Sequence, residues 1–339
     1  MTRVTFEILH EVVGHYMFER GIMQRLSGYD VDLILMHTLW ILATPDSYRS
    51  VATQFNTTPS TVYRHFIKVV EALCELAPRF IKWPSQEERG VIANAFEAYS
   101  GFPGVVGACD GTYMVINAPI VQPRRYIDRH HQYSLNTQAV CDHNLVVRDL
   151  HVGEAGALTD ARVFRRSPLC RQLLTNPDKL EANQHMLGYS IYMLTDKLLT
   201  PIRNNGRLTR AQKAYNYRLS RCRVRIEHCF GKIFSQWRRL KFLESYNIEY
   251  AVKTIVACFV LHNFMILEGH EVHDFVDPDE PDDVIEDQDD MAEQLLEGDY
   301  DNLPEDFLER NPIVRLLQEA RVAGRHKRNE IVQRFADLN

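Results

Sequence analysis

Two acidic residues, Asp110 and Glu227, stand in sequence surroundings that suit phosphoryl-transfer chemistry. Asp110 ends a predicted hydrophobic strand in Gly107-Ala-Cys-Asp-Gly-Thr112, where a carboxylate is costly unless it is hydrogen-bonded or bound to a metal. Carboxylates that hold two Mg²⁺ ions roughly 3.5–4 Å apart can activate an attacking oxygen and stabilise a leaving one. The alternative interpretation of Asp110 is a turn residue, because Asp-Gly is a common pair in tight hairpins.

The surroundings of Glu227 favour a phosphate-binding helix face. The predicted helix opens with a capping box, Thr209-Arg-Ala-Gln212, and Glu227 shares a face with Arg223. An apolar stripe predicts its buried side: Ile226, Phe230, Ile233, Phe234 and Trp237. Basic side chains crowd around the acid: Arg221, Arg223, Arg225, His228, Lys232, Arg238, Arg239 and Lys241. The alternative is an exposed helix whose Arg223–Glu227 pair contributes only about 0.3 kcal/mol.

Charge is segregated along the chain, so the net charge of −6 is misleading. Residues 271–309 contain 18 Asp or Glu and neither Lys nor Arg, which leaves 27 acidic and 39 basic residues elsewhere, a net charge near +12. A body this basic favours a polyanionic partner such as DNA. The alternative is an ordinary solvated surface.

Residues 1–85 are predicted to form a helical domain that contains a helix-turn-helix. Residues 46–55 and a helix from about Thr61 to Leu76 flank a polar break at Asn56-Thr-Thr-Pro-Ser60. In that arrangement a DNA groove would be faced by Ser60, Thr61, Arg64, His65 and Lys68. The alternative is an ordinary helical hairpin with a core face made of Val62, Phe66, Val69 and Val70.

Residues 100–268 change to short β-rich runs followed by helices, which predicts an α/β domain with a mixed sheet flanked by helices. The predicted strands are Val105–Cys109, Tyr113–Ile116, Asn136–Val140, Leu145–Val147 and His185–Gly188. One helix is predicted from about Asp160 to Leu173. Residues 269–310 form an acidic tract whose composition predicts flexibility. Residues 311–339 predict a C-terminal helix with a basic run from Arg321 to Arg328, the one candidate for nuclear import.

The cysteines and the hydropathy pattern indicate a compartment. The seven cysteines are scattered and form no CxxC pair, which predicts reduced thiols in the cytosol or nucleus and argues against structural zinc. No continuous apolar run approaches the ~20 residues of a membrane span. Residues 1–20 fit an amphipathic helix better than a signal peptide.

An ordered series of motifs resembles the PIF/Harbinger transposases and their domesticated relatives. The series covers about residues 1–265, and its members stand in the order found in that family. They are Asp46 to Val70, Gly107 to Pro119, Tyr133 to Asp142, Gly156 to Leu169, Leu198 to Pro201, Tyr215-Asn216, Arg223 to Gly231 and Leu261-His-Asn263. The resemblance implies an RNase H-like fold and a DDE endonuclease, whose first and third acids would be Asp110 and Glu227.

The segment that resembles the site of the family's second acid departs from the pattern. Where the family has the form L-G-D-S-x-Y-P, this chain has Leu187-Gly-Tyr-Ser-Ile-Tyr-Met193, so Tyr189 stands at the acid position. A tyrosine has an unperturbed pKa of about 10 and is neutral at pH 7, so it does not replace a carboxylate. The family's usual His-Asp is here Thr159-Asp160. Asp160 and Asp142 are the acids that could substitute.

The resemblance therefore implies a domesticated transposase without strand cleavage, acting as a nuclear protein- and DNA-binding scaffold or chromatin-complex subunit, with a cytoplasmic fraction also compatible. It implies a Myb/SANT-like or MADF-type DNA-binding partner, and no cofactor. The candidate DNA-binding residues are Arg64, Lys68, Arg223, Arg225, Lys232, Arg238 and Arg239. Two alternatives stay open. One is an active Mg²⁺- or Mn²⁺-dependent endonuclease with metal ligands Asp110, Glu227 and Asp160, and the other is a sequence-specific helix-turn-helix DNA binder.

Overall fold

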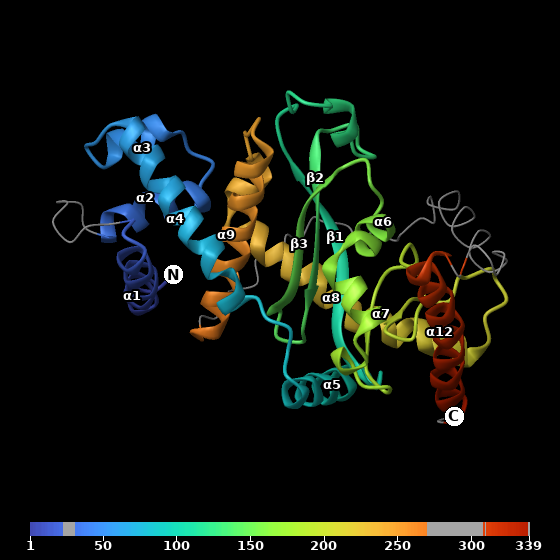
Figure 1. The fold of residues 1–339 in the computed structure, drawn as a ribbon. Coiled ribbons are helices and arrows are strands. Elements are labelled where there is room, and N and C mark those ends of the chain that lie inside the picture. Colours follow the sequence, from blue (N-terminus) through green and yellow to red (C-terminus); the bar gives the residue numbers. More distant parts are fainter. Residues whose placement is uncertain (23–30, 270–307, 309, 338–339) are drawn as a thin grey trace.

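A long central strand, β1 (Val105–Val115), organises a five-stranded sheet in the order β3-β2-β1-β4-β5. In this computed structural model the described residues are 1–22, 31–269, 308 and 310–337 (Figure 1). Strands β2 (Ser134–Cys141) and β3 (Val147–Ala155) continue the sheet antiparallel to β1. Strands β4 (His185–Leu187) and β5 (Leu198–Leu199) run parallel to it. The predicted α/β class, an RNase H-like mixed sheet flanked by helices, is confirmed.

β1 is one strand where the sequence predicts two. Asp110 pairs with Ala139 and Gly111 with Gln138 in an unbroken antiparallel register. The interpretation of Asp110-Gly111 as a hairpin turn is therefore wrong, and so is the expectation that Asp110 ends its strand. Pairing along the full length of β2 overrides the local turn preference of Asp-Gly. As a result, Asp110 lies inside the sheet.

Helices cover both faces of the sheet (Figure 1). Ala108 and Met114 share a core with helix α8 (Arg210–Gln236) and helix α9 (Ile248–Leu267). Cys109 instead packs with residues of helix α6 (Asp160–Arg166) and helix α7 (Pro168–Thr175). Successive side chains of a strand point to opposite faces, so residues two apart share a face. Asp110 therefore lies on the same face as Ala108 and points toward α8. Helix α9 is long and apolar enough to cross a membrane by composition, but 67% of its most apolar stretch is buried inside the protein.

The helix expected over residues 160–173 is two helices, α6 (Asp160–Arg166) and α7 (Pro168–Thr175). Pro168 has no backbone N–H, so it cannot continue α6 and instead occupies the first turn of α7. Ser167 caps α7 by accepting a hydrogen bond from the Cys170 N–H at 3.2 Å. The break leaves Asp160 in the first turn of a short helix beside β1 and β2.

The elements at the two ends of the sheet complete the fold. Helix α5 (Gln86–Ser100) packs against β1 and α8, and the C-terminal helix α12 (Pro312–Asp337) packs against α8, α7 and β5. Lys327 on α12 donates to the carbonyls of Gln184 and Asp196 at 2.7 and 2.8 Å. The basic run from Arg321 to Arg328 thus takes part in packing. The acidic tract, residues 269–310, lies outside the described residues apart from Gly269, Leu308 and Arg310.

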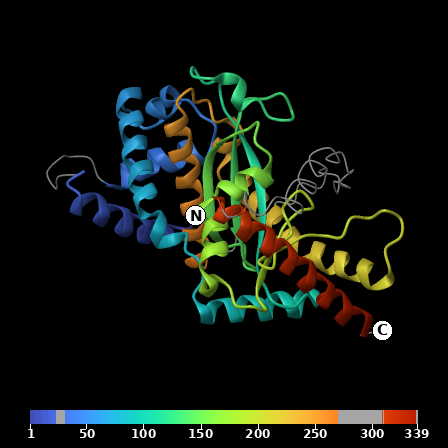
Figure 2. The same cartoon turned by 45° about the vertical axis from the view of Figure 1, so that its right-hand side comes forward.

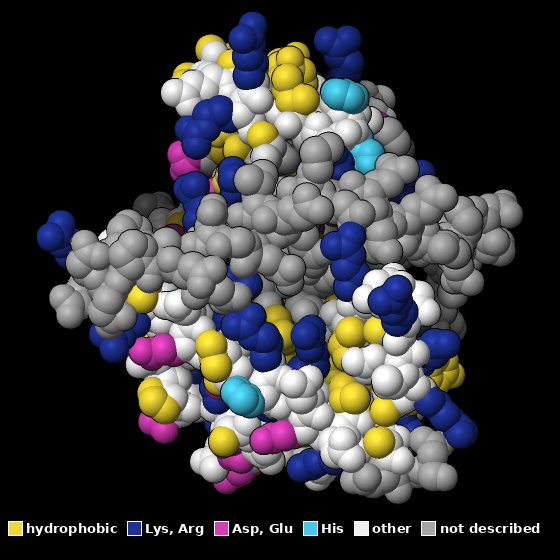
Figure 3. Space-filling view, turned by 90° about the vertical axis from the view of Figure 1, so that its right-hand side faces the viewer, with side chains coloured by type: hydrophobic (Ala, Val, Ile, Leu, Met, Phe, Trp, Pro, Cys, Tyr) yellow, Lys and Arg dark blue, Asp and Glu magenta, His cyan; other side chains and the backbone are white. Residues whose placement is uncertain are grey.

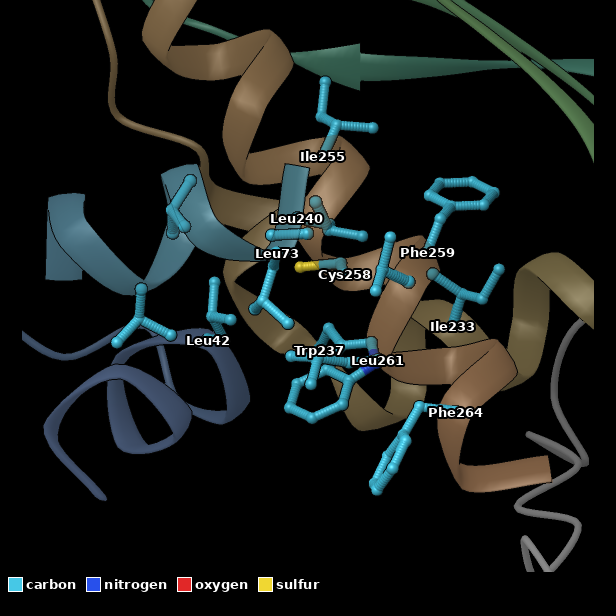
Figure 4. Close-up of a cluster of buried hydrophobic side chains, with 14 of the residues drawn as sticks. Leu42, Leu73, Ile233, Trp237, Leu240, Ile255, Cys258, Phe259, Leu261 and Phe264 are labelled. Carbon is cyan, nitrogen blue, oxygen red and sulfur yellow. The ribbon is translucent and has the colours of Figure 1, made fainter. Parts of the chain in front are cut away.

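The described part of the N-terminal region, residues 1–22 and 31–85, contains α1 (Arg3–Glu19), α2 (Val31–Ala43), α3 (Tyr48–Gln54) and α4 (Pro59–Phe80). Its apolar core continues into that of α8 and α9: Leu42 and Leu73 lie in one cluster with Trp237 and Phe264 (Figure 4). Tight packing of α4 against α9 therefore fixes this region relative to the sheet.

The α3–turn–α4 unit has the expected helices and turn, but the prediction that Thr61 and His65 face a DNA groove is wrong. Thr61 and His65 are buried, and so are the four residues of the alternative core face, Val62, Phe66, Val69 and Val70. Ser60, Arg64 and Lys68 are exposed. Helix α4 thus has a narrower polar face than predicted, because His65 contacts His37 of α2 and Thr61 contacts the helix-capping Thr58.

Buried His65 makes the stability of this region depend on pH. His65 lies 2.9 Å from His37, Nδ1 to Nδ1, and burial followed by the positive charge of neighbouring His37, Lys68 and Arg64 lowers the pKa of His65 to about 4. Burial also lowers the pKa of His37. Between pH 6.5 and 4 the unfolded chain binds a proton at His65 that the folded chain does not, so stability falls as pH falls.

We expect the free energy of unfolding to decrease by on the order of 2–3 kcal/mol between pH 7 and pH 4 through His65. Denaturant titrations at several pH values would measure it. His65→Leu should flatten this dependence, whereas His15→Gln, at an exposed position of α1, should leave it unchanged. Equal pH dependence in His65→Leu and the unaltered chain would contradict the assignment.

Candidate nuclease-type site

The site begins where β1 and β4 lie side by side in parallel. Ala108 pairs with Leu187. Asp110 stands two residues further along β1, and Tyr189 stands two residues beyond Leu187, where β4 ends. Asp110 shares the face of Ala108 and points toward α8. Tyr189 reaches the same helix through its contacts with Glu227 and Arg223. Tyr189 holds the position where the family resemblance implies the second acid, and it is close enough to Asp110 for the Asp110 charge to raise its pKa.

Tyr189 is held against α8 by Glu227 and Arg223. Its hydroxyl donates a hydrogen bond to the Glu227 carboxylate. The Arg223 guanidinium carbon lies 3.4 Å from the centre of the Tyr189 ring, a cation–π contact. Arg223 Nη2 also lies 3.9 Å from Glu227 Oε1. Tyr189, Arg223 and Glu227 are thus in mutual contact, and we call these three residues the tyrosine clamp.

The electrostatics keep Tyr189 a neutral donor. Burial raises the pKa of Tyr189, and the negative charges of Asp110 and Glu227 raise it further. Burial, followed by the charge of Asp160, raises the pKa of Asp110 well above its usual value, although the Gly111 N–H and the Arg223 cation act in the opposite direction. Burial at this site therefore favours the neutral form of both Asp110 and Tyr189.

Asp160 is near Asp110 but lies on the other face of β1. A Cβ atom on Gly111 would collide with the Asp160 carboxylate, so Asp160 occupies the space on the side of the strand to which residue 111 points. Asn136, on the same face, donates to Asp160 Oδ1 at 2.7 Å. Asp110 points to the opposite face. Gly111, interpreted from the sequence as a turn residue, instead leaves room for Asp160.

Asp142 has a structural role. Its side chain is buried and accepts hydrogen bonds from the N–H groups of Asn144 and Val146 at 2.8 and 3.1 Å. It also pairs with Arg148 at 2.7 Å. These contacts hold the turn between β2 and β3, so Asp142 is engaged away from the tyrosine clamp.

The carboxylates present do not fit a divalent-metal centre. Proteins of the DDE nuclease superfamily generally use divalent metals such as Mg²⁺, which requires several carboxylate oxygens to converge on one point. Within the described ranges, no three His, Cys, Asp or Glu side chains come together as a metal site. Glu227 is occupied by Tyr189 and Arg223, and Asp160 is separated from Asp110 by the strand itself.

The basic side chains predicted around Glu227 are distributed among different roles. Arg223 is buried in the tyrosine clamp. Arg221 and Arg225 lie over the ring of Tyr99 on α5, at 4.8 and 4.5 Å. Arg239 donates to the Asp46 carbonyl at 3.2 Å and so ties the segment after α8 to the N-terminal helices. Lys232 is half-buried and Arg238 is exposed, so these two, with Arg64 and Lys68, lie at the surface.

Tyr192 is a site residue that sequence reasoning did not identify. It is buried and packs beside Cys109 and Phe164 on the α6 face of the sheet. Burial raises the pKa of the Tyr192 hydroxyl, and the neighbouring Cys109 and Asp160 raise it further. The only available signal was its place three residues after Tyr189, in a segment that the resemblance had already singled out.

The fold is that of the RNase H-like DDE nucleases. Residues 109–263 match the family model described as "DDE superfamily endonuclease". The chain belongs to the family of the Harbinger-derived protein HARBI1, whose name describes it as a candidate nuclease. Mouse HARBI1 is 31% identical over 245 residues, which cover 71% of this chain and 69% of the mouse protein.

Two further relatives are similar over a smaller share of their length. Human HARBI1 is 31% identical over 221 residues, covering 63% of this chain and 61% of the human protein. The Arabidopsis thaliana protein named Antagonist of Like Heterochromatin Protein 1 is 29% identical over 237 residues, covering 66% of this chain and 60% of the relative. The chain thus spans about three fifths of these two proteins. No solved structure matches the chain.

Proposed function

We propose that this chain is a domesticated Harbinger-type transposase that does not cleave DNA and acts in the nucleus as a protein- and DNA-binding scaffold. The observation that carries the proposal is the tyrosine clamp. A phenol stands beside Asp110 at the implied second acid position and is hydrogen-bonded to Glu227, the implied third acid. Two of the three positions expected to hold metal are therefore engaged with each other.

The energetic consequence supports loss of cleavage. Two-metal catalysis needs carboxylate ligands that bind both metal cations and position the reacting oxygens. Tyr189 contributes no charge because its pKa is raised by burial, and the Arg223 cation stands where a metal cation would be repelled. Residues that act as one catalytic unit fail together, so a single missing acid is severe.

The positive charge of the chain and its relatives support the retained binding of DNA and of a protein partner. The body of the chain has a net charge near +12 outside residues 271–309, and Arg64, Lys68 and Arg238 are exposed. Such surfaces bind phosphate backbones through release of counterions. The name of the Arabidopsis relative describes it as an antagonist of Like Heterochromatin Protein 1. We extend that setting to this chain and propose a chromatin-complex role with a Myb/SANT-like or MADF-type partner.

A second candidate function, an active nuclease with Asp160 as the substitute acid, has one observation in its favour. Asp160 is close enough to Asp110 to raise its pKa. The opposite-face placement of the two carboxylates weighs against it, because one metal would need the strand between them to deform.

Incubation of supercoiled plasmid with the full chain and Mg²⁺ or Mn²⁺ tests the proposal. We expect a mobility shift that shows binding, while the plasmid recovered after protein removal is still supercoiled. Asp110→Ala and Asp160→Ala should behave like the unaltered chain. Nicked product that Asp110→Ala abolishes would overturn the loss of cleavage, and loss on Asp160→Ala as well would establish the second candidate.

A further inference from the structure

The loop between β1 and β2, residues 116–133, stands beyond the ends of the strands in two views (Figure 1, Figure 2). It displays basic and apolar side chains together. Arg124 and Arg125 are exposed, and Ile120 and Val121 have exposed fractions of 86% and 72%. At the top of Figure 3, dark-blue, cyan and yellow side chains cluster over this end of the molecule. We call this segment the β1–β2 loop.

The acidic residue of the β1–β2 loop, Asp128, stabilises the backbone of the loop. Asp128 is buried, and its Oδ1 atom accepts hydrogen bonds from the N–H groups of His130 and Gln132 at 2.8 and 3.0 Å. The exposed charges of the loop are therefore positive. Nearby, Arg129 lies over the Tyr113 ring at 5.8 Å, which adds a third guanidinium to the same end of β1.

The loop is ordered and tied to the candidate site. The Ala157 N–H donates to the Arg125 carbonyl at 3.2 Å, which joins the loop to the segment that leads to Asp160. Gln122 has a left-handed backbone, φ 50°, and accepts a hydrogen bond from Arg125 at 2.9 Å. A non-glycine residue in this conformation persists only where its surroundings hold it there. The loop thus presents its arginines in a fixed arrangement.

We propose that the β1–β2 loop is a duplex-DNA contact, in which Arg124 and Arg125 bind phosphates and Ile120 and Val121 lie against the bases or sugars. The inference rests on the proposed DNA-binding function and names its surface. Apolar side chains beside arginines are the combination that proteins use to wedge into a duplex. An acidic protein surface would pair with the arginines, but it would not explain two largely exposed aliphatic side chains beside them.

The position of the loop fits a duplex that also passes the tyrosine clamp. Five residues of β1 separate Asp110 from Val115, about 17 Å at about 3.3 Å per residue. Successive phosphates of one strand are roughly 3.4 Å apart along the duplex axis. The loop would therefore meet DNA about half a helical turn from Asp110.

The test is binding of a labelled 30-base-pair duplex to the full chain, measured by fluorescence anisotropy between 50 and 200 mM salt. Arg124→Gln/Arg125→Gln should weaken binding at least tenfold at the lower salt and reduce the slope of log K against log salt by about 1.8. Ile120→Ser/Val121→Ser should weaken binding severalfold and leave the slope unchanged. The control, Arg3→Gln/Arg315→Gln, removes two exposed arginines that each pair with a glutamate on their own helix.

The outcomes separate the inference from the proposed function. If the unaltered chain binds no duplex, the DNA-binding function itself is overturned, and this inference with it. If the chain binds and Arg124→Gln/Arg125→Gln matches the control in affinity and slope, the inference alone is overturned. Unchanged binding by Ile120→Ser/Val121→Ser would overturn the apolar contact. Circular dichroism of each variant verifies that it is folded.

Discussion

Tyr189→Asp is expected to give the chain a divalent-metal site, with Mn²⁺ affinity at least tenfold above that of the unaltered protein. The substitution supplies a carboxylate at the position beside Asp110 and removes the donor that occupies Glu227. Two unit charges about 4 Å apart near a protein surface attract by about 4 kcal/mol. Even after the cost of desolvation, the attraction between the added carboxylate and Mn²⁺ exceeds the ~1.4 kcal/mol that corresponds to a tenfold change in affinity. Isothermal titration calorimetry measures the affinity.

Two companion variants isolate the cause. Tyr189→Phe also frees Glu227 from the hydroxyl but adds no charge, so it should bind Mn²⁺ no better than the unaltered chain. Asp110→Asn combined with Tyr189→Asp should lose the gained affinity. Equal Mn²⁺ binding by Tyr189→Asp and Tyr189→Phe would show that residue 189 does not share a site with Asp110.

Asn263→Ala is expected to cause the largest loss of stability, a decrease in the free energy of unfolding of about 3–5 kcal/mol. The buried Asn263 amide on α9 accepts from the Val147 N–H at 2.8 Å and donates to the Val147 and Phe80 carbonyls at 2.7 and 3.0 Å. Removing it leaves three backbone groups without these partners, at the point where α4, α9 and β3 meet.

Asn247→Ala is the matched control, because Asn247 caps the same helix by accepting from the Tyr250 N–H at an exposed position. Losing such a cap costs about 1 kcal/mol. Urea titrations followed by circular dichroism compare the two. Similar losses in both variants would contradict the role given to Asn263.

Much of the fold could be predicted from the sequence because local patterns and tertiary packing agree there. The capping box at Thr209 and the apolar stripe of α8 form as expected. The continuity of β1 could not be predicted, because Asp110-Gly111 is a strong hairpin signal and only pairing with β2 overrides it. The break between α6 and α7 could have been found, since Ser167-Pro168 is a helix-start signal.

The candidate site was only partly predictable for a related reason. Family resemblance located Asp110, Tyr189 and Glu227 in the sequence, but no spacing rule says that Arg223 is buried beneath the Tyr189 ring. That contact depends on how α8 crosses the sheet. The face on which Asp160 lies likewise follows from the missing side chain of Gly111, whose role appears only once β1 is continuous.

Crystals of the unaltered chain soaked in millimolar Mn²⁺, with diffraction recorded at the manganese edge, test the state of this site most directly. We expect no anomalous peak within the ~2.2 Å coordination distance of Asp110 or Glu227. We also expect the Tyr189 hydroxyl to remain hydrogen-bonded to Glu227. Two peaks about 3.5–4 Å apart between those carboxylates, with Tyr189 displaced, would contradict this expectation.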